Sequence, residues 1–177
     1  LEFRRVLFRS PDSRVRVALA ARLQGKELLP LISDPEYMVR ITAVRKMPTE
    51  LLPLVRHDPD PEVRAWVARR IDPRALADMA FDTDALVRRE VASRIPLHQL
   101  SLLAMDSDML VRFTAAERIA EEELFAFLND SEAEVRDLAR ERIAKIPSLA
   151  QQLASHDRRP VMVRIHPVAS KSEETER

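Results

Sequence analysis

A Val-Arg pair recurs at a fixed interval along this chain, and this periodicity constrains the fold more than any other feature. The pair stands at residues 15–16, 39–40, 63–64, 87–88, 111–112 and 135–136, so each copy follows the last after 24 residues without insertion or deletion. A constant period of this length is typical of a stacked array in which each repeat packs only against its neighbours. The sequence therefore predicts an elongated array and not one closed globule.

The first half of each repeat has the pattern of an α-helix. In five of the six copies an aspartate stands five residues before the pair, with Ser10 in this column of the first copy, and Pro35 and Pro59 follow two of these aspartates. We expect each aspartate to be the helix N-cap and each proline the first helical residue. Apolar residues then recur at helical spacing, as Val63, Val67 and Ile71 do, and form one buried stripe. A basic residue falls in each last turn, where a cation suits the exposed carbonyls. These residues are Arg22, Lys46, Arg70, Arg94, Arg118 and Arg142.

The second half of each repeat has a different pattern, with apolar residues three positions apart, as at Leu28 and Leu31. Side chains at this spacing lie above one another on one edge of a 3₁₀ helix. Pro30 and Pro53 stand inside the segment, which disfavours a regular α-helix there. Each repeat is therefore predicted to be an α-helix followed by a short 3₁₀ helix, and the chain an all-α solenoid.

The ends of the chain depart from the repeat. Residues 1–10, LEFRRVLFRS, resemble a translated sequencing adapter, and we expect them to be an artefact. Six repeats occupy residues 11–146. Residues 147–168 are expected to be a degenerate C-terminal cap, with Leu149 and Leu153 in a last short helix and an extended segment at 161–165. The polar residues 169–177 are expected to be disordered.

The repeated unit D-x-(D/P)-x-x-V-R-x-x-x-A-x-(R/K)-I resembles the leucine-rich repeat variant family over residues 11–146. The resemblance implies a right-handed superhelix of alternating α and 3₁₀ helices. Full-length members of the family carry an N-terminal cysteine cluster that holds a 4Fe–4S centre and are encoded beside nitrogen-fixation genes. This chain has no cysteine, so we expect such a cluster only in a missing upstream part. A looser similarity is to HEAT-like and armadillo-type arrays, whose usual period is longer.

The aspartate and arginine columns allow two interpretations. A row of arginines could bind phosphates, or each arginine could pair with an aspartate of a neighbouring repeat. We predict the second arrangement, a structural ladder, because the net charge is zero and only 5% of residues are aromatic, whereas single-strand binding uses stacking rings beside basic residues. The ladder residues are Asp34, Asp58, Asp82, Asp106, Asp130, Arg40, Arg64, Arg88, Arg112 and Arg136.

Charged residues outside these columns are distributed unevenly. Residues 1–74 carry 15 basic and 10 acidic residues, and residues 75–177 carry 14 and 19. The extra arginines are Arg45, Arg69, Arg74 and Arg89, and the extra glutamates of repeats five and six are Glu117, Glu121, Glu122, Glu123, Glu134 and Glu141. They form either a surface for a protein partner or a solvated face with no partner. Trp66 and Tyr37 are expected to be packing residues.

No group of residues predicts a reaction or a bound metal. The four histidines have no pair at ligand spacing, and a single glycine could not build a phosphate loop. No apolar run has the roughly 18 residues of a membrane span. We therefore expect a non-enzymatic, cytoplasmic scaffold for a protein partner, without a cofactor in this chain. A basic-faced, nucleic-acid-binding HEAT-like array is the alternative, and a HEAT-like lyase comes third.

Overall fold

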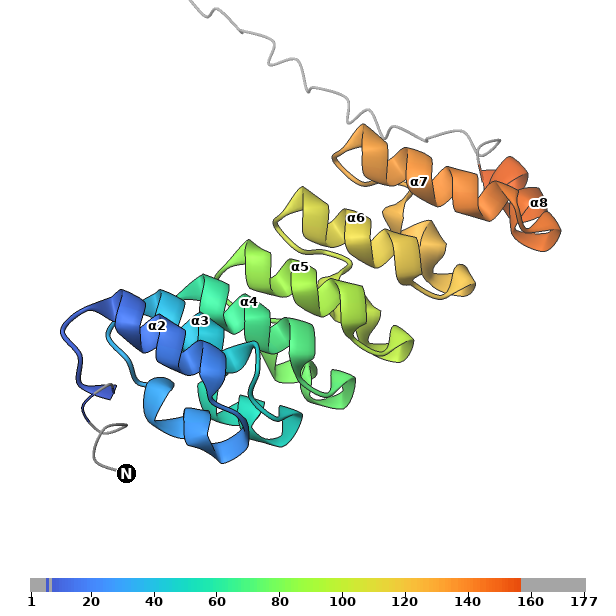
Figure 1. Cartoon of the computed structure of the whole chain (residues 1–177). Helices are drawn as coiled ribbons and strands as arrows, with labels where there is room; N and C mark the ends of the chain where they lie inside the picture. The colour runs from blue at the N-terminus through green and yellow to red at the C-terminus, as the bar shows by residue number, and fades with distance from the viewer. Residues whose placement is uncertain (1–5, 7, 157–177) are drawn as a thin grey trace, which may run out of the picture.

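The computed structural model describes residue 6 and residues 8–156, and this part of the chain is one row of stacked helices (Figure 1). The α-helices are α2 (Ser13–Arg22), α3 (Tyr37–Val44), α4 (Pro61–Arg70), α5 (Ala85–Arg94), α6 (Met109–Arg118), α7 (Ala133–Ala144) and α8 (Pro147–His156). Each packs against the next, and no described residue lies in a strand. The predicted all-α solenoid is confirmed.

Short 3₁₀ helices connect the α-helices of successive repeats, as the three-residue spacing predicts. They are η1 (Gly25–Leu31), η2 (Thr49–Val55), η3 (Pro73–Ala75), η4 (Ala77–Met79), η5 (Leu97–Leu103) and η6 (Glu121–Phe127). Pro30 and Pro53 lie inside η1 and η2, where the poorer hydrogen bonding of a 3₁₀ helix tolerates them. At the start of η1, Gly25 has φ +57°, a conformation that L side chains rarely adopt.

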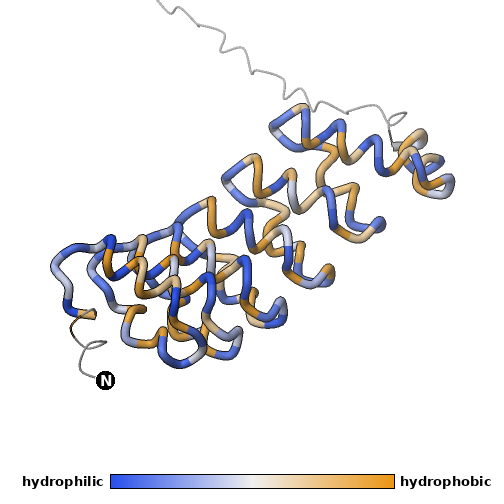
Figure 2. Tube along the Cα trace, in the orientation of Figure 1, coloured by the Kyte–Doolittle hydropathy of each residue, from blue (hydrophilic) through white to orange (hydrophobic). Residues whose placement is uncertain are grey.

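The core runs continuously through the array. The valines of the Val-Arg pairs from Val39 to Val135 are all fully buried, and the apolar pairs of the 3₁₀ helices, such as Leu100 and Leu103, are buried. Hydrophobic residues recur between hydrophilic ones along the array (Figure 2), and the buried ones, such as Val63, Val67 and Ile71, form the predicted stripe. Because each stripe faces a neighbouring repeat, no single repeat can bury its apolar surface alone.

The predicted helix N-caps are wrong by two residues. The N-cap residues of α2, α4, α5 and α6 are Asp12, Asp60, Asp84 and Asp108. Asp58 stands two residues before the N-cap of α4, and its Oδ1 accepts the backbone N–H of Asp60 at 2.9 Å. Pro61, and not Pro59, is the first residue of α4. Because the aspartates of the column do not cap the helices, their carboxylates can pair with residues of another repeat.

The two ends of the described range differ from the middle. Phe8 packs against the edge of the core, and the carbonyl of Ser10 accepts a hydrogen bond from Arg16 Nη1 at 2.7 Å. At the other end α8 lies against α7, with Leu149 and Leu153 partly buried. The extended segment predicted at 161–165 and the polar tail predicted at 169–177 lie outside the described residues, as do residues 1–5 and 7 of the adapter-like segment.

Candidate functional site: the aspartate and arginine ladder

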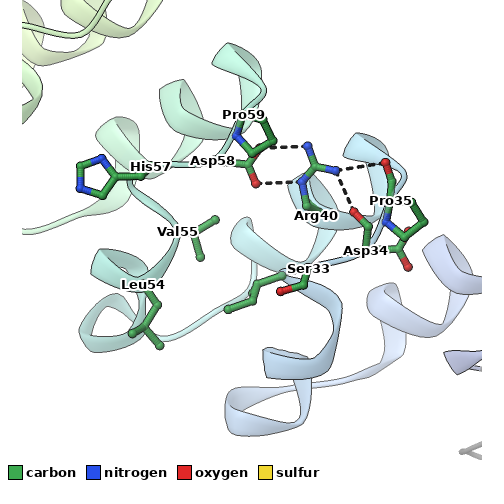
Figure 3. A pocket seen from close by; sticks show the side chains of 10 residues that line it. Ser33, Asp34, Pro35, Arg40, Leu54, Val55, His57, Asp58 and Pro59 are labelled. Atoms are coloured by element: carbon green, nitrogen blue, oxygen red, sulfur yellow. Dashed lines mark hydrogen bonds and ion pairs between the residues drawn. The ribbon is translucent and has the colours of Figure 1, made fainter.

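Each aspartate of the ladder is held by two hydrogen bonds from one arginine of the preceding repeat. Arg40 donates from Nε to Asp58 Oδ2 at 2.8 Å and from Nη2 to Asp58 Oδ1 at 2.9 Å (Figure 3). Its Nη1 donates to the carbonyl of Asp34 at 2.8 Å. The side chains of Arg40 and Asp58 are 8% and 2% exposed. This two-point geometry is the strongest form of arginine–carboxylate pairing.

The same contact recurs along the array, between residues 18 positions apart. Nε–Oδ2 distances run from 2.6 to 2.8 Å in the other pairs, which are Arg16–Asp34, Arg64–Asp82, Arg88–Asp106 and Arg112–Asp130. The predicted ladder omits Arg16, although its Val-Arg pair belongs to the same series. Arg136, at the other end, donates to the carbonyls of Asp130 and Ser131, and Ala154 occupies the residue 18 positions on.

This geometry leaves the ladder little capacity to bind an anion. Both oxygens of each carboxylate accept from one guanidinium, and the third donor nitrogen of that arginine is bound to a backbone carbonyl. A phosphate would have to displace a carboxylate that is already bound at two points. The ladder therefore joins consecutive repeats, and its arginines are not a ready phosphate site.

The ladder shifts the protonation of its aspartates. For Asp82, burial by itself raises the pKa, but hydrogen bonds from Arg64 and from the backbone N–H of Asp84, with the positive charges of Arg64 and Arg88, lower the pKa overall. The pKa values of Asp34 and Asp106 are lowered in the same way, because their hydrogen bonds and the nearby arginine charges outweigh the effect of burial. For Asp130 the hydrogen bond from Arg112 is the largest cause of the lowered pKa.

Acid should therefore weaken the array. A carboxyl group whose pKa is lower in the folded chain stabilises the fold above its unfolded pKa of about 4. That stability is lost as the pH falls through the folded value. We expect melting temperatures to change little between about pH 7 and 5 and to fall below about pH 4. In the variant Arg64→Met with Asp82→Asn this acid-dependent fall of the melting temperature should be smaller than in wild type. An equal fall in the variant and wild type would show that the ladder pair does not cause it.

From Lys46 onward, the basic column at the helix C-termini contacts the preceding repeat instead of its own helix. Arg94 Nη1 donates to the carbonyl of Ala68 at 2.6 Å, and Arg142 Nη1 donates to the carbonyl of Ala116 at 2.6 Å. Arg118 and Arg70 make the same contact, and Lys46 donates to the carbonyl of Ala21. These carbonyls belong to the last turn of the previous α-helix, where backbone acceptors lack helical partners. A second row of polar contacts thus joins the repeats.

The four arginines predicted as a partner surface divide into two groups. The guanidinium carbons of Arg45 and Arg69 lie 4.7 and 4.6 Å from the centre of the Trp66 ring, and Arg69 also pairs with Glu90. These contacts hold both arginines in place. Arg74 and Arg89 are exposed, and neither side chain has a hydrogen-bonding or ionic partner among the described residues. The structure therefore does not bring the four together as one equivalent set.

The two aromatic residues singled out in the sequence differ in environment. Trp66 is partly buried and packs against the core. Tyr37, the first residue of α3, is 38% exposed and lines a hollow of about 570 Å³ with Met38 and Val17. The same hollow is also lined by Ser13, Arg14 and Glu36. Tyr37 is a surface residue and not the packing residue that was predicted.

The described residues contain no group of three histidine, cysteine, aspartate or glutamate side chains placed to hold a metal ion. None of the described helices combines the length and the apolar character that a membrane crossing requires. The polar side chains with the most contacts are those of the two rows that join the repeats, and nothing in their arrangement activates a nucleophile.

The comparisons with known proteins agree with this architecture. No protein-family model matches the chain, and no curated protein matches its sequence. Among solved structures the chain is similar to one described as a leucine-rich repeat variant with a novel repetitive protein structural motif. The TM-score is 0.73 at 34% sequence identity, over 84% of this chain and 67% of that one. The predicted resemblance is confirmed, and the chain belongs to the leucine-rich repeat variant family.

Proposed function

We propose that the chain is a non-enzymatic scaffold that binds an acidic protein partner through the exposed arginines of its middle repeats. One observation carries this proposal: Arg74 and Arg89 are exposed and have no partner among the described residues. The ladder arginines, by contrast, already donate hydrogen bonds from Nε, Nη1 and Nη2, as Arg40 does. Exposed charges of this kind accelerate association with a partner of opposite charge.

The test reverses the charge of the two free arginines. Arg74→Glu and Arg89→Glu, separately and together, should slow association with the partner about tenfold or more at low salt and leave the melting temperature unchanged. Partners are first identified by crosslinking and then measured by surface plasmon resonance. Lys26→Glu is the matched control, an exposed charge reversal outside this surface. Equal association rates for wild type and the double variant would refute the proposed surface.

A nucleic-acid-binding array is the second candidate, favoured by the 12 basic against 9 acidic residues in positions 11–74. Its signature is a steep fall of affinity with salt, because each bound phosphate releases counterions. We expect weak DNA and RNA binding with a shallow dependence on salt. A steep slope that Arg74→Glu with Arg89→Glu reduces would favour this candidate over the protein scaffold.

We further propose that the natural protein carries a 4Fe–4S cluster upstream of these repeats and is linked to nitrogen fixation, as the family resemblance implies. The residues of this chain do not fit such a cluster, because 4Fe–4S centres are bound by cysteine thiolates and this chain contains no cysteine. Purified anaerobically, this chain should contain no stoichiometric iron, and a chain with the natural sequence restored before Pro11 should contain iron and sulfide. Iron bound by the present chain would contradict the ligand assignment.

A further inference from the structure

The charges on the exposed face of the α-helices reverse along the array. An exposed residue stands six positions after the valine of each Val-Arg pair, and its charge changes from one half of the array to the other. From the second repeat to the sixth these residues are Arg45, Arg69, Ser93, Glu117 and Glu141. We name these five residues the charge column, and its order of charges is antisymmetric about Ser93.

Contacts between neighbouring helices show that the charge column crosses one surface. The guanidinium carbon of Arg45, which follows α3, lies 4.7 Å from the centre of the Trp66 ring on α4. Arg69 on α4 pairs with Glu90 on α5. The helices from α3 to α7 pack in order, each beside the next (Figure 1). The same exposed position in each of these repeats therefore belongs to one continuous face.

The inner charged residues of the column have capacity for another partner. Glu117 has no hydrogen-bonding or ionic partner among the described residues. Arg69 donates to Glu90 from Nε and Nη2, so its Nη1 is unused within the described part of the chain. That pair and the Trp66 ring hold Arg69 in place, while 45% of its side chain stays exposed. A carboxylate of another molecule could therefore bind Arg69 without displacing Glu90.

An antisymmetric column can pair with a copy of itself. In a dimer with two-fold symmetry each contact occurs twice, because residue i of one copy meets residue j of the other and residue j meets residue i. With the two-fold axis parallel to α5 and beside Ser93, the two faces meet and the two arrays run in opposite directions. Arg69 of each copy then lies opposite Glu117 of the other. The outer residues of the column, Arg45 and Glu141, are matched in the same way.

The other two-fold arrangement of these faces is unfavourable. An axis along the array would place each repeat opposite the same repeat of the second copy. The arginines of the two charge columns would then come together, as would the glutamates, and opposed like charges weaken association. The chain has 29 basic and 29 acidic residues, so two copies do not repel each other through their net charge. Charge therefore favours a second copy, in the antiparallel arrangement, as the occupant of this face.

Two aromatic side chains beside the charge column add an apolar contact to this arrangement. Trp66 stands three residues before Arg69, and Phe113 stands four residues before Glu117. At 3.6 residues per turn these two positions lie on opposite sides of the column. Both rings are only partly buried by the core of their own chain. Because the two-fold axis exchanges the two sides, Trp66 of one copy would lie near Phe113 of the other.

We propose that the chain forms a two-fold symmetric dimer through the charge column, with antiparallel arrays and with Ser93 of both copies near the axis. The dimer goes beyond the acidic partner proposed above and does not depend on it. Arg74, in η3, lies off the α-helices that carry this face and would remain accessible. Arg89, on α5, lies beside the column, so dimer formation and partner binding would compete there.

The first test reverses one charge at a time and then mixes the variants. Arg69→Glu opposes two carboxylates at both contacts, and Glu117→Arg opposes two guanidinium groups. In sedimentation velocity at low salt, each variant alone should dimerise about tenfold or more weakly than wild type. An equimolar mixture of the two variants should dimerise as wild type does, because both contacts of a mixed dimer join opposite charges. A mixture as monomeric as the single variants would overturn the proposal.

Two charge reversals away from the face are the matched controls for this test. Lys26 and Glu50 are exposed and lie in the 3₁₀ helices η1 and η2. Lys26→Glu and Glu50→Arg should therefore dimerise like wild type. A loss of dimer in either control equal to that in Arg69→Glu would show that net charge, and not the charge column, governs association.

The second test locates the two-fold axis. The chain contains no cysteine, so Ser93→Cys introduces a single thiol beside the proposed axis. A short bismaleimide should crosslink Ser93→Cys to a species of twice the 20.3 kDa chain mass. Ser101→Cys, at an exposed residue of η5, should not be crosslinked. Equal crosslinking of the two variants would place the axis elsewhere and overturn the arrangement.

The wild-type chain separates this dimer from other assemblies and from the proposed scaffold function. Between about 1 and 100 μM its mass should rise to that of a dimer and no further, and about 0.5 M salt should dissociate the dimer. A mass that keeps growing with concentration would indicate head-to-tail chains and reject the two-fold dimer. A chain that stays monomeric but associates with an acidic partner through Arg74 would uphold the scaffold function and reject the dimer alone.

Discussion

Replacing Val87 with aspartate should destabilise the array by several kcal/mol, because it would bury an unpaired carboxylate. Val87 is fully buried and lies on α5, whose neighbours α4 and α6 pack against it on either side. Repeats in such an array are coupled mainly to their neighbours, so the damage should be greatest next to repeat four. Amide exchange should accelerate first in α4, α5 and α6 and later in α2 and α7.

The neighbouring residue supplies the control for this substitution. Leu86 is 43% exposed and stands in the first turn of α5, where a negative charge suits the helix dipole. Leu86→Asp should therefore change the melting temperature little. A melting curve for Val87→Asp that matches wild type would show that the register assigned to the buried stripe is wrong.

The parts of the fold that could be predicted from the sequence are those repeated in every copy. Valine at the same position of six successive units, as at Val63 and Val87, identifies one buried stripe even though each helix is short. The three-residue spacing of Leu100 and Leu103 likewise predicts the 3₁₀ helices. In both cases the signal is local, because the residues concerned lie within one or two turns of each other.

The caps could not be predicted in the same way. In Asp58-Pro59-Asp60-Pro61, both aspartates are good N-cap residues and both are followed by proline, so local preference does not distinguish them. The difference arises from Arg40 of the previous repeat, which binds Asp58 and leaves Asp60 to cap α4. Contacts between residues 18 positions apart decide this choice, and no local pattern reports them.

The same limit applies to the candidate site. The sequence predicts Arg69 as a free surface charge, but it stacks on Trp66 and pairs with Glu90 of the following helix. The position of Arg94 predicts that it stabilises its own helix, and instead it contacts the carbonyl of Ala68. A charged residue in a repeat array has neighbours on both sides, and its sequence position alone does not show which of them it contacts.

Removing one partner of the most buried ladder pair should have the second large effect. Arg40→Met leaves the Asp58 carboxylate, 2% exposed, without its counterion, and should cost about 3–5 kcal/mol of unfolding free energy. Arg40→Met with Asp58→Asn removes both charges and keeps an acceptor for the backbone N–H of Asp60. The double variant should therefore be more stable than Arg40→Met alone.

A double-mutant cycle on this pair, measured by urea unfolding, tests most directly whether the ladder joins the repeats. The cycle combines wild type, Arg40→Met, Asp58→Asn and the double variant, and we expect a coupling energy of about 2–3 kcal/mol. The exposed pair Lys145–Glu141, with side chains 68% and 66% exposed, is the reference and should give a coupling several times smaller. A coupling between Arg40 and Asp58 no larger than that of the exposed pair would contradict a structural role for the ladder.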